Sequence, residues 1–380
     1  MKMQNYRQKR RGAILVLAAV FMVLMFALLA FAVDMGYLYM VRTQLQRTAD
    51  AAAIAATWSL LDGELATGQN NSPYAVSSAR DTADQYTQLN KVLNSQPTLA
   101  QSDITVGYLS NPFNPNLQLD LSGSQGYNAV QVRVRRTTDQ NGVVPLFFAR
   151  VLGIDQAGSQ ALATAAFVSS VSGFQEPADG SKLAFLPFAL YEDTWDALMI
   201  GQGTDSWKYN PDTKEVSSGP DGIKELNLYP QDTDSSGNSG TIDIGNPNNS
   251  TRDLSRQIQE GLNHEDLSYS NGKIELNADG VLDLNGDTGI SAGIKDDLAY
   301  IKGQPRILPL YRSVSGNGNN AQYVIVRFVG VRIMDVDLTG SKKTSKRVII
   351  QPATVYVRGG IPGGSGQTST FIYSPISLVR

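Results

Sequence analysis

Residues 12–33 read GAILVLAAVFMVLMFALLAFAV, an uncharged apolar run that directly follows Lys9, Arg10 and Arg11. As an α-helix this run would be about 33 Å long, because each residue adds about 1.5 Å, and a hydrocarbon core is about 30 Å thick. The sequence therefore predicts a transmembrane helix over 12–33, preceded by a basic segment over 1–11. The rest of the chain has to be interpreted as attached to a membrane.

The charges around this run predict its orientation. The first 11 residues carry five basic and no acidic residues, whereas Asp34 follows the run directly. The positive-inside rule then predicts a cytoplasmic N-terminus and export of the chain from Asp34 onward. Of the 32 basic residues, 27 lie beyond this segment against 35 acidic ones, so nucleic acid is not an expected partner.

A cleavable secretory signal is the alternative to a retained anchor. Ala30-Phe31-Ala32 fits the small-x-small pattern that a signal peptidase accepts, with the cut after Ala32. Against cleavage, the apolar run exceeds the 7–15 residues of a typical signal core, and the chain after it continues with helical periodicity.

The chain also has no cysteine, which excludes disulfides and thiol chemistry.

A stalk helix over 34–62 is expected to continue the membrane helix. Apolar residues recur there at spacings of three and four, and 49–56 is rich in alanine. Small side chains allow a neighbouring element to approach closely. That neighbour is either the next domain of this chain or a second protein.

The remainder predicts two exported domains of an α+β protein. Residues 63–172 form an α+β domain with a helix from Tyr74 to about Leu93, a short apolar helix over 145–152 and strands at 104–109, 117–121, 127–137 and 159–169. Residues 181–380 form a β-rich domain with long loops over 201–300, helices at 251–261 and 295–302 and strands at 183–190, 307–311, 323–337, 347–357 and 370–379.

The anchor and its flanks resemble a known family. Arg10-Arg11-Gly12-Ala13, the apolar span, Ala32-Val33-Asp34-Met35-Gly36-Tyr37 and the stretch from Gln44 to Ala53 are similar to TadE/TadG-like proteins of the tight-adherence (Flp) pilus-assembly system. Residues 128–132 and 145–150 resemble the region that follows the anchor in many members. The resemblance implies a single-pass protein of a bacterial cytoplasmic (inner) membrane, with its bulk periplasmic or extracellular. Such a protein serves the assembly or anchoring of an adhesive pilus, without catalysis.

One departure narrows this resemblance. Pseudopilin members have a processing site in which a glycine is followed five residues later by glutamate, whereas here Gly12 is followed by Leu17. A TadG-like anchored role is therefore expected in place of incorporation into a fibre.

Candidate ligand residues are few. Asp232, Asp234, Ser236 and Asp243 place oxygen atoms at the spacing of a calcium loop, although such residues also form plain turns. Residues 283–287 are a shorter set of the same kind. No catalytic, cofactor-binding or other metal-binding residue is expected.

Two further patterns are better explained without chemistry. The Asp-x-Ser-x-Ser pattern of a von Willebrand type A metal site occurs at 120–124 and at 266–270. The first leaves no room for the helix that such a site needs, so a hairpin loop is expected, and the second does not follow an apolar strand. The single histidine, His264, lies in a polar stretch and is expected at the surface.

The sequence thus predicts a non-enzymatic, membrane-anchored component of Tad/Flp-type pilus assembly. Its expected partners are other Tad pilus-assembly proteins and the membrane, with no small-molecule substrate. The alternative is an envelope-anchored surface adhesin or structural protein that shares only the Tad-like anchor.

Overall fold

The computed structural model describes residues 11–67, 71–230, 240–245, 250–287, 289–316, 318–339, 346–363 and 368–379. The chain divides into two compact units. Unit 1 comprises the chain up to Ala166 together with its last residues from Ile376, and unit 2 comprises Phe167–Pro375.

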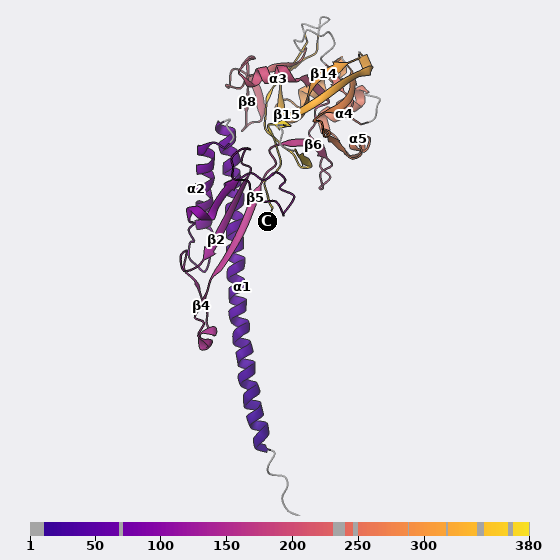
Figure 1. Cartoon of the computed structure of the whole chain (residues 1–380). Helices are drawn as coiled ribbons and strands as arrows, with labels where there is room; N and C mark the ends of the chain where they lie inside the picture. The colour runs from indigo at the N-terminus through magenta and orange to yellow at the C-terminus, as the bar shows by residue number, and fades with distance from the viewer. Residues whose placement is uncertain are drawn as a thin grey trace, which may run out of the picture. The chain divides into compact units, whose positions relative to one another are not determined.

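One helix, α1 (Arg11–Thr67), dominates unit 1 and is drawn in indigo in Figure 1. Its large apolar side chains from Ile14 to Phe31 are all exposed, and this part is long and apolar enough to cross a membrane. From Val41 onward a face of the same helix is buried. The predicted continuation of the membrane helix into 34–62 is confirmed, and the helix runs on to Thr67.

A second helix, α2 (Pro73–Leu89), packs on the last turns of α1. Pro73 stands at its first position, where the missing N–H of proline costs nothing. Gly63 allows the close approach, because a Cβ atom there would lie 2.7 Å from the Cα of Ala75. Gly63 therefore lies inside α1 as a helix contact and does not end the helix.

The sheet of unit 1 has four antiparallel strands in the order β1 (Ile104–Gly107), β2 (Ala129–Arg136), β5 (Ser159–Ala166) and β21 (Ser377–Leu378). The strand expected over 127–137 is present as β2, and its alternate residues Val130, Val132 and Val134 are fully buried. They lie opposite Ala165, Ala163 and Ala161 of β5, and α1 packs on both strands. Figure 1 shows β2 and β5 running beside α1.

The chain between β2 and β5 extends this strand pair into a narrow hairpin. Its strands are β3 (Val144–Pro145) and β4 (Gln156–Ala157), and its tip carries the short 3₁₀ helix η2 (Ala149–Leu152). Gly153 ends η2 with φ 81°, a left-handed conformation that glycine adopts without steric cost. The predicted short helix ending at Gly153 is thus present, although only its second half is helical.

Unit 2 is β-rich, as the sequence predicts. Its elements are β6 (Val171–Gln175), β7 (Phe188–Tyr191), α3 (Glu192–Met199), β8 (Trp207–Asn210), β9 (Glu215–Ser218), β10 (Leu226–Tyr229), β11 (Gly240–Ile242), α4 (Thr251–Glu260), α5 (His264–Ser268), β12 (Lys273–Glu275), β13 (Leu282–Asp287), α6 (Lys295–Tyr300), β14 (Pro305–Ser315), β15 (Ala321–Asp337), β16 (Arg347–Pro352), β17 (Val355–Tyr356), β18 (Gly360–Pro362), β19 (Ser369–Thr370) and β20 (Ile372–Tyr373). Three-residue 3₁₀ turns, η3 (Ala292–Ile294) and η4 (Gly318–Asn320), precede α6 and β15.

Five strands of unit 2 form a closed sheet. β15 pairs with β13, β13 with β11, β11 with β7 and β7 with β14, and β14 pairs back onto β15. Phe174, Phe185 and Phe328 form part of the core, with ring centroids 5.1–6.1 Å apart in edge-to-face contacts. A second core cluster surrounds Trp195 of α3.

Two expectations for unit 2 need correction. The stretch 201–300, expected as long loops with helices at 251–261 and 295–302, contains these helices as α4 and α6, and in addition the strands β8 to β13 and the helix α5. Residues 283–287, whose composition is typical of turns, lie in β13 and pair with β15 and β11. Strand partners distant in sequence outweigh the local turn preference of Asp, Asn and Gly in this segment.

The last strand also differs from expectation. The sequence predicts one strand over 370–379 in the β-rich domain. In the structure the end of this segment forms β21, in which Ser377 pairs with Ala166 and Leu378 with Ala165, both in β5 of unit 1. The N–H of Val379 donates to the carbonyl oxygen of Thr164 at 2.9 Å. The division lies at 166/167 where a domain end at 172 was expected, and unit 2 is an insertion between two neighbouring strands of unit 1.

Candidate membrane-anchor site

The first acidic residue after the apolar run, Asp34, binds the hairpin tip. Its carboxylate accepts hydrogen bonds from the backbone N–H groups of Phe147 at 2.9 Å, Phe148 at 3.0 Å and Ala149 at 2.6 Å. Asp34 is buried. Burial opposes its ionisation, but the three N–H groups and the cation of Arg150 outweigh burial and hold the pKa of Asp34 below its ordinary value. This contact between Asp34 and the backbone of residues 147–149, called the latch below, joins α1 to the hairpin.

An aromatic contact lies one turn further along the helix. The ring of Tyr37 meets the ring of Phe147 edge to face, with centroids 5.1 Å apart. Asp34 and Tyr37 are three residues apart and so lie on one face of α1. Together they hold the hairpin tip where α1 leaves the apolar span.

Polar side chains of the next turns attach α1 to the rest of unit 1. The side-chain oxygen of Gln44 accepts the N–H of Leu93 at 3.0 Å, and the amide of Gln46 donates to the carbonyl of Leu162 at 3.1 Å. The hydroxyl of Thr57 donates to the carbonyl of Ala165 at 3.2 Å. Each bond joins the helix to a segment that lies far away in sequence.

The alanine-rich face of α1 is buried within this chain. Ala49, Ala52, Ala53 and Ala56 are fully buried. The strand β5, on which α1 packs, also has buried alanines, at positions 161, 163 and 165. Small side chains on both surfaces allow helix and sheet to approach closely. The sequence allowed either the next domain of this chain or a second protein to cover this face. In the structure, the domain of the same chain covers it.

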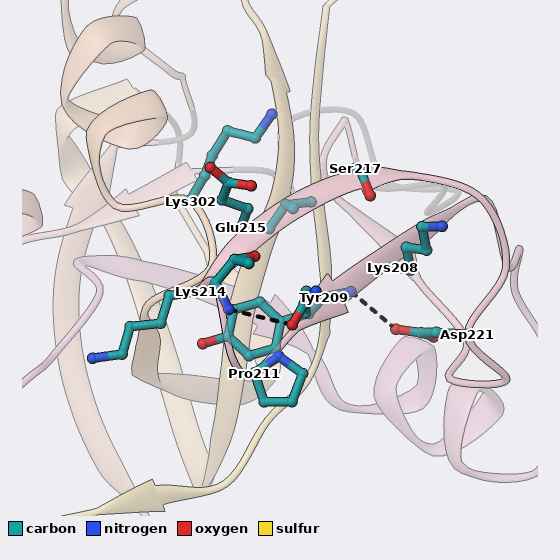
Figure 2. Close-up of a pocket in the computed structure, with 11 residues that line it drawn as sticks. Lys208, Tyr209, Pro211, Lys214, Glu215, Ser217, Asp221 and Lys302 are labelled. Carbon is teal, nitrogen blue, oxygen red and sulfur yellow. Dashed lines mark hydrogen bonds between the residues drawn. The ribbon is translucent and has the colours of Figure 1, made fainter.

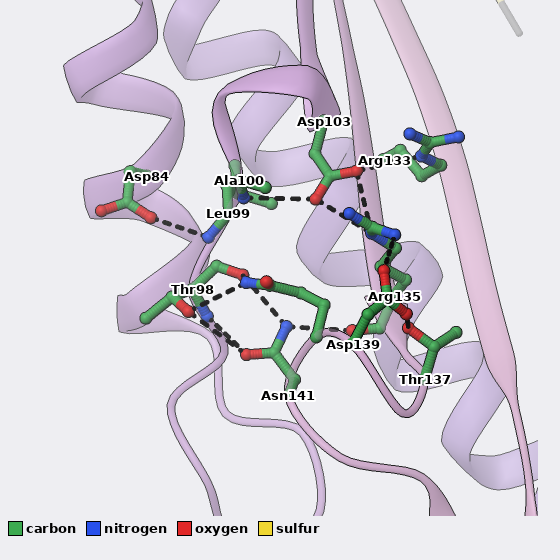
Figure 3. Close-up of polar contacts among 11 residues, drawn as sticks. Asp84, Thr98, Leu99, Ala100, Asp103, Arg133, Arg135, Thr137, Asp139 and Asn141 are labelled. Carbon is green, nitrogen blue, oxygen red and sulfur yellow. Dashed lines mark hydrogen bonds and ion pairs between the residues drawn. The ribbon is translucent and has the colours of Figure 1, made fainter.

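The sheet carries a buried ion cluster on its β1 side, shown in Figure 3. The side chain of Asp103 is fully buried and lies 3.0 Å from Nε of both Arg133 and Arg135. It also accepts the N–H of Ala100 at 3.2 Å. The two arginines of β2 thus fix the loop before β1, and Arg135 also pairs with Asp139 at 2.5 Å.

Asn71, two residues before α2, binds the loop that precedes β2. Its side chain donates to the carbonyls of Gly123 and Gln125 and accepts the N–H of Tyr127 at 2.6 Å. Its own N–H donates to Glu64 at 3.3 Å. Burial raises the pKa of Glu64 to about 7, and the Asn71 N–H opposes this rise.

Unit 2 has a shallow hollow on its β8–β9 hairpin, with a volume of about 810 Å³. The guanidinium carbon of Arg332 lies 3.4 Å from the ring centroid of Tyr209, so the hairpin is held on β15 by a cation–π contact. Figure 2 shows the ammonium groups of Lys208, Lys214 and Lys302 pointing in different directions. They do not converge on one point, so these three lysines do not form an anion-binding site in the hollow.

Of the four predicted calcium ligands, the structure describes one, Asp243. Asp232, Asp234 and Ser236 lie outside the described residues. Asp243 follows β11, and its N–H donates to the carbonyl of Asn285 at 2.8 Å. Among the residues that the structure describes, no group of three or more His, Asp or Glu side chains could hold a metal ion. Calcium binding at this segment stays a prediction.

The other patterns have structural roles. Residues 120–126 form a loop before β2, in which Asp120 accepts the N–H of Ser122 at 2.8 Å. Asp266 caps α5 and pairs with Arg256. His264 is exposed, as predicted, and its Nδ1 lies 2.6 Å from Glu176.

Sequence reasoning missed the three residues that fix unit 1, namely Asp34, Asn71 and Asp103. Asp34 had a local signal, since it is the first charge after the apolar run, but its partners lie more than 110 positions away. The partners of Asn71 in 123–127 lie more than 50 positions away, and no pattern within the sequence indicates them.

Two family models match the chain. A model described as "Putative Flp pilus-assembly TadE/G-like" matches residues 12–66, and one described as "Putative Tad-like Flp pilus-assembly" matches residues 55–165. The matched region ends at residue 165, two positions before unit 2 begins at Phe167. Neither a curated protein nor a solved structure matches the chain.

Proposed function

We propose that the chain is a non-enzymatic, membrane-anchored component of a Tad/Flp-type pilus machine, because residues 12–165 match two models of the TadE/G-like Flp pilus-assembly family. In this proposal residues 12–33 cross the bacterial cytoplasmic membrane once, with the N-terminus in the cytoplasm. Unit 2 and the part of unit 1 that follows residue 33 then lie outside the cytoplasm and contact other Tad pilus-assembly proteins. Domains of this family are generally structural and not catalytic.

The observation that carries the proposal is the continuity of α1. The same helix presents an exposed apolar span and, without a break, the buried face that forms the centre of unit 1. A helix of this kind holds its domain at a set height and orientation relative to the membrane, whereas a flexible linker would not. Such positioning suits a component that must meet other proteins at one level above the bilayer.

Photocrosslinking in the native envelope tests the proposal. A photoreactive amino acid at an exposed position of unit 1, such as Tyr74 or Leu89, is expected to capture other Tad proteins from membranes of piliated cells. Intact mass of the recovered chain separates a retained anchor from cleavage after Ala32. Recovery of the chain from the soluble cytoplasm, or crosslinks to envelope proteins unrelated to pili, would contradict the proposal and favour the adhesin alternative.

A further inference from the structure

The hairpin tip of unit 1 exposes an unusual concentration of apolar side chains. Phe147, Phe148, Val151, Leu152 and Ile154 are all exposed within eight positions. Val151 is 88% exposed and Leu152 80%, higher than any other large apolar side chain in the part of the chain that the structure describes. A surface of this kind in a folded domain marks a place where something else covers it.

This apolar tip is a preformed structure. The N–H of Ile154 donates to the carbonyl of Ala149 at 3.1 Å, and the N–H of Gly153 to that of Arg150 at 3.0 Å. Leu146, at the base of the tip, is the residue that turns into the core. The backbone therefore holds Val151 and Leu152 outward.

The position of the tip identifies what covers it. Asp34 fixes residues 147–149 beside the first turn of α1 after the apolar span, and Tyr37 packs on Phe147. In Figure 1 the hairpin beyond β4 runs beside α1 toward its exposed apolar part. The apolar tip thus lies beside the end of the apolar span of α1.

The charge of the tip agrees with a lipid surface. Arg150 is the single charged residue from 146 to 154, and it is exposed. Apolar side chains with a neighbouring cation are the composition of segments that lie at the boundary between headgroups and acyl chains.

We propose that residues 147–154 enter the headgroup and acyl boundary of the same bilayer that α1 crosses. The inference rests on the proposed membrane anchor. Unit 1 then has two attachments to the membrane, and the second prevents it from rotating about the axis of α1. The latch at Asp34 holds the two attachments in register.

The experiment uses the absence of cysteine from the chain, which makes every introduced cysteine unique. Full-length Leu152→Cys carries an environment-sensitive nitrobenzoxadiazole label in nanodiscs of pure phospholipid with spin-labelled quencher lipids. Leu24→Cys, in the span, is the reference for a position in lipid. Tyr74→Cys, exposed at the start of α2, is the reference for a position in water.

The label at 152 is expected to be quenched severalfold more strongly than the label at 74, most of all by lipids spin-labelled near the headgroup. Quenching at 152 equal to that at 74, with strong quenching at 24, would overturn the inference and leave the anchor intact. That result would also follow if a partner protein covers the tip, because no partner is present. Weak quenching at 24 as well would contradict the proposed anchor itself.

Discussion

At the scale of single residues, Asp34 determines whether the hairpin tip stays on α1. Its carboxylate accepts three backbone N–H groups, and hydrogen bonds to a charged acceptor are stronger than neutral ones. Because its folded pKa lies below the ordinary value of about 3.9, the contact contributes fully above that pH. The contribution is lost as the pH falls through the folded pKa.

Replacing Asp34 should therefore loosen the tip without unfolding unit 1. In Asp34→Ala, hydrogen exchange at the amides of Phe147, Phe148 and Ala149 is expected to become roughly tenfold faster or more, because these donors lose their acceptor. Asp62→Asn, an exposed carboxylate on the same helix, should leave their exchange unchanged. Unchanged exchange in Asp34→Ala would show that the latch does not hold the tip.

Glu64 gives unit 1 a distinctive pH dependence. Between its ordinary pKa of 4.5 and its folded pKa of about 7, the folded state keeps a proton that the unfolded state has lost. The free energy of unfolding therefore falls as the pH rises through this window and levels off above it.

Glu64→Gln should remove this dependence. At pH 8 the variant is expected to gain on the order of 2 kcal/mol in the free energy of unfolding, and near pH 4.5 it should match the parent. Chemical denaturation in detergent at both pH values measures the difference, with Asp62→Asn as the control for removing a carboxylate. A gain of equal size at both pH values would contradict a titrating Glu64.

At the scale of elements, the sequence predicts what regular patterns determine. The helix α1, the helix α4 and the strand β15 are long or strongly periodic, and each lies where it was expected. Segment 283–287 could not be predicted, because its local composition favours a turn while two strands distant in sequence pair with it. The latch could not be predicted either, since Asp34 and the hairpin tip meet only in the folded chain.

Gly63 packs α1 on α2, and Gly36 of the same helix serves as its control because it has no neighbour among the described residues. A Cβ at Gly63 would lie 2.7 Å from the Cα of Ala75, whereas a Cβ at Gly36 would meet nothing within 4 Å. In a helix without other contacts, replacing glycine by alanine stabilises by about 0.5–1 kcal/mol.

Gly63→Ala should therefore destabilise unit 1 by about 1–3 kcal/mol, because the backbones of α1 and α2 must move apart. Gly36→Ala should leave the stability unchanged or raise it. Thermal unfolding of both variants in the same detergent measures the difference. Equal effects at the two positions would show that the close approach at Gly63 is unimportant.

At the scale of the whole molecule, unit 2 is an insertion in a smaller domain. Ser377 pairs with Ala166, so the two ends of the insertion are neighbours across a strand pair, where Cα atoms lie about 5 Å apart. A chain in which a short turn replaces residues 167–375 should therefore fold as unit 1 alone, with one cooperative transition. Removing residues 376–380 from that chain should lower its melting temperature, because β5 loses its partner β21. An unfolded product from the first deletion would contradict the insertion.

The proposed function makes the chain a membrane-anchored pilus-assembly component that carries a β-rich inserted unit. Pilus assembly in the source organism tests this proposal most directly. Deletion of the gene should abolish or sharply reduce assembled Flp pili in electron micrographs. The full-length chain should restore them, whereas an exported form without residues 1–33 should not. Normal pili on the deletion strain, with altered attachment or envelope integrity, would contradict the account and support the adhesin alternative.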